Sequence, residues 1–310
     1  MKKIGLIQID GVMPNLALMK LSTFYKSKGY DVTFIDLSSF EIDSWFGSKI
    51  FTGGSGINLE QDLPDEIEIL TPDYEKFKLN YSIGFTSRGC IRKCDFCIVK
   101  EKEGMIKEVN MDWIKHSKVI LLDNNFLASP KWREKLKYFI DNKIKVCFTQ
   151  ANDIRLINKE NAEILLKVMS YDRKFSKKSY YFAFDDIKLE IVIREKIDLM
   201  KSIGFNPKSF MFYILCGFNS SHEDDYRRFQ IIKNYGCVPY IMRFNNKKSD
   251  IWLNHFSRYI NRKYYEFIPF ETYNNGVLIN KKLEPEKLIH ECSKLNTEKD
   301  VNLLDQYLGE

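Results

Sequence analysis

The sequence predicts an α/β protein, because strand-like apolar runs alternate with amphipathic, helix-like stretches along most of its 310 residues. Six strands are expected after residue 80, at residues 81–86, 118–122, 144–149, 180–184, 210–215 and 237–242. Six βα units indicate a partial (β/α)6 barrel of the TIM type, since a complete eightfold barrel would need more chain than remains.

Helix signals fall between these strands. Asn158 precedes an amphipathic stretch at 161–169, and Asp186 precedes another at 189–203 that stops at Gly204. Ser221 and Asp224 have the spacing of a capping box at the start of a helix over 223–233. A further helix is expected at 252–262, and residues 246–310 are expected to form a C-terminal helical extension.

The first 79 residues predict a smaller layer of their own. A strand over 3–9 is followed by Pro14, a good first residue for a helix, and the helical pattern stops at Gly29 before a strand over 30–37. This βαβ unit indicates a small Rossmann-like or flavodoxin-like layer. The glycine-rich turn at 52–56 is a weak phosphate-binding motif, because no clear helix follows it.

Composition places the chain among globular proteins, with 44% hydrophobic and 29% charged residues. No apolar run approaches the roughly 20 residues of a membrane helix, so we expect a cytoplasmic protein that spans no membrane. Residues 1–79 carry 8 Lys against 12 acidic residues, a net of −4, so the total of +6 leaves +10 for residues 80–310. That excess is either a solvated surface or a face for an anionic or nucleic-acid partner.

Three of the seven cysteines, Cys90, Cys94 and Cys97, form a C-x3-C-x2-C run just after the first strand of the barrel region. One apolar helix face would not carry the charges between them, and structural zinc would need a fourth ligand nearby. Three thiolates suit a 4Fe–4S cluster with one iron left free. The other cysteines, at 147, 216, 237 and 292, are interpreted as small buried hydrophobes. For Cys216, which follows the fifth strand, a thiol that donates a hydrogen atom or binds a metal is the alternative.

This run, with Phe96 before its third cysteine, resembles the signature of radical S-adenosylmethionine (SAM) enzymes, and its place after the first of six strands agrees. The resemblance covers residues 80–245. It implies that Cys90, Cys94 and Cys97 bind a 4Fe–4S cluster that reductively cleaves SAM to a 5′-deoxyadenosyl radical. It also implies an electron donor such as flavodoxin or ferredoxin, and a small-molecule or nucleic-acid substrate that the sequence does not identify.

The same resemblance gives cofactor-binding roles to polar residues at the expected strand ends, besides Phe96. Asp123, Asn124 and Asn125 follow the second strand, where they either bind the SAM amino group or cap a helix. Asp185 follows the fourth strand and is expected to face the site, whereas Asp186 caps the next helix. Arg243 ends the sixth strand, where it suits an anionic substrate or the SAM carboxylate.

Two further interpretations complete the sequence-based picture. The N-terminal layer resembles a shortened cobalamin-binding-type domain, but the loop after its first strand lacks the usual histidine, so cobalamin binding is doubtful. The alternative function is a nucleic-acid-associated iron–sulfur or zinc protein without SAM turnover. It rests on the basic, aromatic stretch at 258–265, which could contact phosphates and stack bases, or could equally be a helix that buries its tyrosines.

Overall fold

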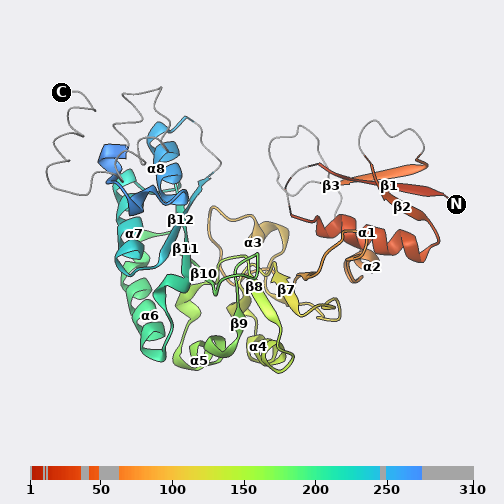
Figure 1. The fold of residues 1–310 in the computed structure, drawn as a ribbon, viewed down its shortest axis with the longest axis horizontal. Coiled ribbons are helices and arrows are strands. Elements are labelled where there is room, and N and C mark those ends of the chain that lie inside the picture. Colours follow the sequence, from red (N-terminus) through yellow and green to blue (C-terminus); the bar gives the residue numbers. More distant parts are fainter. Residues whose placement is uncertain are drawn as a thin grey trace. The chain divides into compact units, whose positions relative to one another are not determined.

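The computed structural model describes residues 2–9, 11, 13–35, 42–48, 63–244 and 249–273 (Figure 1). It is an α/β protein built from parallel sheets. The chain divides into two compact units; unit 1 comprises Met1–Lys93, Ile98–Gln150 and Glu163–Lys178, and unit 2 comprises Cys94–Cys97, Ala151–Ala162 and Ser179–Glu310. The glycine-rich turn at 52–56 and the expected tail beyond residue 273 lie outside the described residues. Within the described ranges, none of the helices is both long and apolar enough to cross a membrane.

The N-terminal part of unit 1 is a three-stranded parallel sheet. Strand β1 (Lys3–Gln8) lies between β2 (Asp31–Phe34) and β3 (Ser44–Ser48). Helix α1 (Leu16–Ser27) connects β1 to β2, and the side chain of Asn15 caps it by accepting a hydrogen bond from the Leu18 amide. The predicted βαβ unit is confirmed in these elements, while β3 was not expected.

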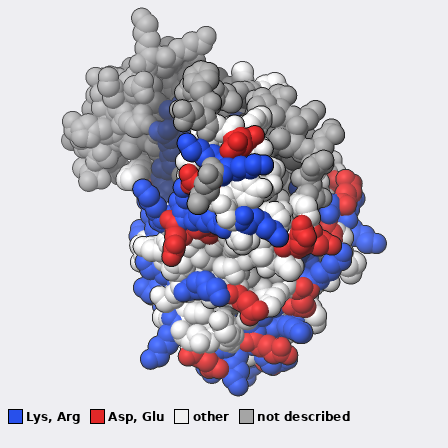
Figure 2. Space-filling model, turned by 90° about the vertical axis from the view of Figure 1, so that its right-hand side faces the viewer, with Lys and Arg blue, Asp and Glu red and all other residues white. Residues whose placement is uncertain are grey.

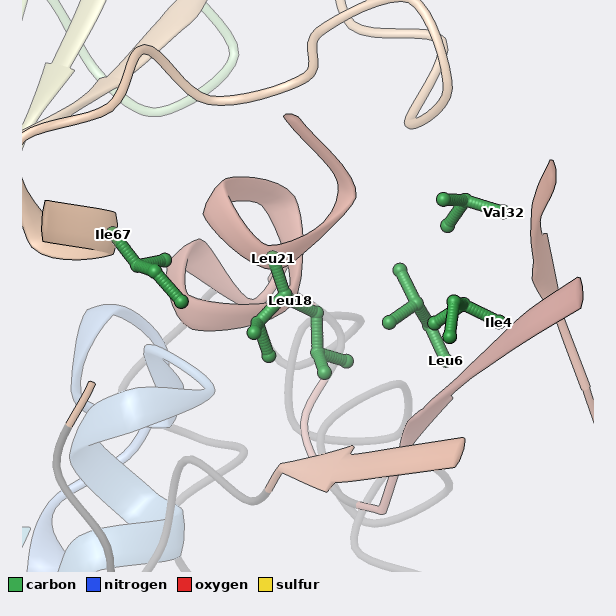
Figure 3. Packing of buried hydrophobic residues seen from close by; sticks show 6 residues of the cluster. All are labelled: Ile4, Leu6, Leu18, Leu21, Val32 and Ile67. Carbon is green, nitrogen blue, oxygen red and sulfur yellow. The ribbon is translucent and has the colours of Figure 1, made fainter. Parts of the chain in front are cut away.

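A small apolar core holds this layer together. Figure 3 shows side chains from β1, β2, α1 and the short helix α2 (Asp65–Glu68) gathered between helix and sheet: Ile4, Leu6, Leu18, Leu21, Val32 and Ile67. All are buried, because the apolar positions of β1 and of α1 fall on the faces that the two elements turn toward each other.

The second sheet of unit 1 has four parallel strands in the order β4-β7-β8-β9. Their bounds are Ser82–Gly84, Lys118–Leu121, Lys145–Phe148 and Met169–Ser170. Helices α3 (Val99–Lys102) and α4 (Trp132–Asp141) belong to the connections, as does the antiparallel pair β5 (Ser87–Arg88) and β6 (Lys107–Glu108). Helix α5 (Lys159–Lys167) precedes β9.

Unit 2 contains a three-stranded parallel sheet, β10-β11-β12, with bounds Tyr180–Ala183, Phe210–Cys216 and Val238–Arg243. Helix α6 (Glu190–Ile203) ends at Gly204, whose φ of 111° is left-handed. Helix α7 (His222–Asn234) begins with the predicted capping box of Ser221 and Asp224. Helix α7 packs against β11 and β12, and helix α8 (Ile251–Asn261) packs against β12.

All six strands expected after residue 80 are present, each within two residues of its predicted bounds. The predicted barrel is not shown, because the described strands form separate four- and three-stranded sheets rather than one closed sheet. The architecture shown is therefore α/β with parallel sheets, and the finer expectation of a partial (β/α)6 barrel stays a prediction.

Candidate functional site

Polar side chains follow the strands of both units at their carboxyl ends, which is where open parallel sheets bind ligands. We call the group in unit 1 the cysteine-loop cluster; it comprises residues 86–90, Glu103, Asp123, Asn124 and Asn125. The group in unit 2 is the carboxylate cluster, which comprises Asp153, Arg155 and Asp185.

Asp123 holds the start of the cysteine loop. One carboxylate oxygen accepts hydrogen bonds from the amide of Thr86 at 2.7 Å, and the other accepts from the hydroxyls of Thr86 at 2.6 Å and Ser87 at 2.8 Å. Burial raises the pKa of Asp123, while the bonds from Thr86 and Ser87 oppose that shift. Both oxygens of Asp123 therefore fix the chain that leads to Cys90.

Glu103 clamps the next part of the loop. Its carboxylate accepts from the Arg88 guanidinium at 2.9 Å, the Gly89 amide at 2.8 Å and the Asn124 side-chain amide at 2.7 Å. Burial alone would raise the pKa of Glu103, but the bonds from Arg88 and Gly89 lower it below its ordinary value. Arg88 also pairs with Glu68 of α2, so one guanidinium joins two carboxylates.

The loop also depends on a buried lysine and a left-handed glycine. Lys135 of α4 donates to the Thr86 carbonyl at 2.8 Å and pairs with Glu108 at 2.6 Å. Gly89 has a φ of 82°, and a Cβ there would lie 2.3 Å from the Met105 carbonyl oxygen. Only glycine fits that close backbone approach without a shift.

Two N–H groups donate hydrogen bonds to the sulfur of Cys90 at the end of this loop. Its Sγ accepts from the Arg92 amide at 3.3 Å and from the Asn125 side-chain amide at 3.9 Å. In unit 2, the Cys97 amide donates to the Cys94 carbonyl at 3.0 Å, and the ring of Phe96 lies edge-on to that of Phe218, 5.6 Å between centroids. All three thiols are partly exposed.

The carboxylate cluster surrounds the end of β10. Asp185 Oδ1 accepts the backbone amide of Leu215 on β11 at 3.3 Å, so the carboxyl continues the line of β10. Burial raises the pKa of Asp185 to about 6, against the opposing effects of the Leu215 amide and of the Arg228 and Arg155 charges. Arg155 pairs with Asp153 at 2.6 Å and also interacts electrostatically with Asp185 and Cys94.

Among the other predicted site residues, Arg243 ends β12 and donates to the side chain of Asn254 on α8. Asp186 caps the short helix Ile187–Leu189 by accepting from the Lys188 amide, rather than the longer helix α6 that the sequence predicted it would cap, whose N-cap is Leu189. The ligand-binding roles predicted for residues 96, 123–125, 185 and 243 stay predictions.

Sequence reasoning missed Glu103, Lys135 and Arg228. Arg228 of α7 is fully buried, pairs with Asp225, and donates to the carbonyls of Phe184 and Leu215 at 2.8 Å each. It thus ties the ends of β10 and β11 together beside Asp185. No local motif marks these three residues, because most of the groups that they bind lie in distant parts of the sequence.

Burial does not favour base stacking by the basic, aromatic stretch at 258–265. On the face drawn in Figure 2, basic and acidic side chains are interspersed. In the stretch at 258–265, Tyr259 and Tyr264 are buried, while Arg258, Arg262 and Lys263 are exposed. The stretch therefore buries these two tyrosines and exposes its cations, and the two rings are not available to stack bases.

Comparisons with known proteins give no family for this chain. No protein-family model matches it, and no curated protein matches it. One solved structure, a Plasmodium falciparum HPPK-DHPS triple mutant with pteroate, aligns with a TM-score of 0.28 and 13% identity. That alignment covers 99% of this chain and 51% of the other, so this chain spans about half of that protein. A likeness this weak carries no argument about fold or function.

These findings correct the radical SAM resemblance and its shortened cobalamin-type domain, because no family match supports either. Within the described residues, no three Cys, His, Asp or Glu side chains form a group that could hold a metal ion. This finding overturns the predicted radical SAM function and the alternative of an iron–sulfur or zinc protein. The 4Fe–4S cluster, SAM and cobalamin stay predictions of the motif, as do the ligand roles of Cys90, Cys94 and Cys97.

Proposed function

We propose that this chain is an enzyme that transfers protons to and from a small molecule bound at the carboxyl end of the β10-β11-β12 sheet. Asp185 is the acid–base residue of this proposal. A carboxyl with a pKa of about 6 exists in both protonation states near neutral pH, as general acid–base catalysis requires.

The observation that carries the proposal is the position of Asp185. Its side chain stands beyond the last residue of β10, at the edge where parallel sheets bind ligands, and one of its oxygens is oriented by the Leu215 amide. Strongly perturbed carboxyls with a specific charged neighbour are typical of active sites. Asp185 has two such neighbours, Arg155 and Arg228.

Arg155 is the binding group of the proposal. Its Nε is held by Asp153, which fixes the guanidinium plane, and its side chain keeps a third of its surface exposed. A guanidinium positioned in this way can donate to a polar or anionic group of a bound substrate. Its charge also lowers the pKa of Asp185 and so favours the ionised, proton-accepting state.

We also propose a partial (β/α)6 barrel, a cytoplasmic location and a small-molecule substrate. The two parallel sheets formed by the strands after residue 80 support the barrel.

An assay that does not require a known substrate tests the proposed function. A mixture of cellular small molecules is incubated in D2O with wild-type protein or with Asp185→Asn, and mass spectrometry follows any Asp185-dependent change in mass or deuterium content. We expect at least one compound to change with wild type and not with the variant. The neighbouring Asp186→Asn variant is the matched control and should behave like wild type. Identical profiles for wild type and Asp185→Asn would contradict the proposal.

A further inference from the structure

The β10-β11-β12 sheet has two chemically different faces. Successive side chains of a strand alternate between faces, and one set packs under the helices: Phe182, Phe210, Phe212, Ile214 and Ile241, all buried. The opposite set is Tyr181 on β10, Met211 and Tyr213 on β11, and Tyr240 and Met242 on β12. We call this second set the tyrosine face.

Three rings form a row across the tyrosine face. Tyr213 and Tyr240 are paired directly in the strand register, with ring centroids 5.7 Å apart and planes at 64°. Tyr181 and Tyr213 are also 5.7 Å apart, at 44°. The row runs from Tyr181, which is 5% exposed, to Tyr240, which is 42% exposed, so its outer end meets solvent.

We propose that the tyrosine face binds a planar aromatic ring of the substrate. Aromatic rings attract one another at centroid separations of about 4.5–7 Å in tilted or edge-on arrangements, and a further ring can join this row in the same geometry. Met242, which is 46% exposed beside Tyr240, adds a polarizable thioether that also favours contact with rings.

The tyrosine face lies next to the proposed proton-transfer site. Tyr213 and Leu215 project from the same face of β11, two residues apart, which is about 7 Å along a strand. The Leu215 amide in turn holds Asp185. Because β10 and β11 are neighbours in the sheet, a ring packed on Tyr213 would carry a polar substituent toward Asp185. This deepens, and rests on, the proposed function: the substrate class is a planar aromatic compound with a polar ring substituent.

The test uses a matched pair of neutral probes, benzamide and cyclohexanecarboxamide, which differ in ring aromaticity. Protein with 13C-methyl-labelled methionine is titrated with each, and dissociation constants are fitted from the Met211 and Met242 methyl signals. Fully buried Met200 on α6 is the internal control. We expect benzamide to bind about three- to tenfold more tightly, as aromatic contacts predict.

Amino-acid variants distinguish a failure of this inference from a failure of the proposed function. Tyr213→Leu and Tyr240→Leu should each reduce the preference for benzamide, whereas Tyr213→Phe and the remote Tyr235→Leu should keep it. Asp185→Asn should also keep it, because the rings are intact, even if the proton-transfer assay fails. Equal affinities for the two probes in wild type would overturn the inference. An unchanged preference in both leucine variants, with circular dichroism showing that they are folded, would also overturn it.

Discussion

Replacing Asp185 with Asn should stabilise the protein, and the gain should grow with pH. The pKa of this carboxyl is raised from its ordinary 3.8 to about 6, mainly by burial. At about 1.4 kcal/mol per pKa unit, ionising Asp185 in the folded protein at neutral pH costs about 3 kcal/mol. Its side chain is partly exposed, so solvent reduces this cost, and we expect a gain of about 1–3 kcal/mol.

The pH dependence follows from the direction of the shift. The folded state holds the proton more tightly than the unfolded state, so stability falls as pH rises from 3.8 through about 6. Asparagine keeps an oxygen that can accept the Leu215 amide but cannot ionise. The gain from Asp185→Asn should therefore be roughly half complete at pH 5 and level off above pH 7.

Urea unfolding at pH 5, 6, 7 and 8, followed by circular dichroism, measures this gain for wild type and variant. Asp186→Asn serves as the control at an adjacent, exposed carboxyl. A gain that is the same at every pH, or a loss of stability at pH 8, would refute the reasoning. A gain at neutral pH would also be typical of an active-site residue that lowers stability for the sake of function.

Three other perturbations have defined outcomes. Gly89→Ala should lower stability by about 1–3 kcal/mol, because the new Cβ meets the Met105 carbonyl; the control Gly104→Ala has open space, and equal losses in thermal unfolding would contradict this reasoning. Glu103→Gln should lose about 1–2 kcal/mol at pH 7. Because the pKa of Glu103 is lowered from its ordinary 4.5, its contribution is lost as the pH falls through the folded-state value, so the difference from wild type in urea unfolding should shrink steadily as the pH is lowered below 4.5. Arg228→Met should lose about 3–5 kcal/mol, because it leaves Asp225 buried without its cation, and urea unfolding should show that adding Asp225→Leu recovers most of the loss.

The secondary structure was largely predictable from local patterns. Strand β11, the α7 capping box and the Gly204 stop of α6 each depend on residues a few positions apart, and the sequence located all three. The strand pairings were less predictable, because they depend on contacts between segments far apart in the chain. The described strands lie in separate parallel sheets, which show the α/β class and leave the partial barrel a prediction.

The candidate site was also predictable only in part from the sequence. Asp185 follows the end of β10, as the sequence placed it, and its raised pKa could be known only once its burial was known. No sequence pattern pointed to Glu103, since its hydrogen-bond partners lie 14 to 21 positions away along the chain. The spacing of Cys90, Cys94 and Cys97 predicted a shared metal, and the described residues do not gather into such a group.

By itself, the sequence determined an α/β protein with parallel strands and polar residues at their carboxyl ends, because periodicity and capping are local properties of the chain. Only the tertiary structure decided which of those residues are chemically unusual. Burial and opposing charges, which act through space, raised the pKa of Asp185 and lowered that of Glu103. Strand register, which no local pattern fixes, brought Tyr213 and Tyr240 side by side.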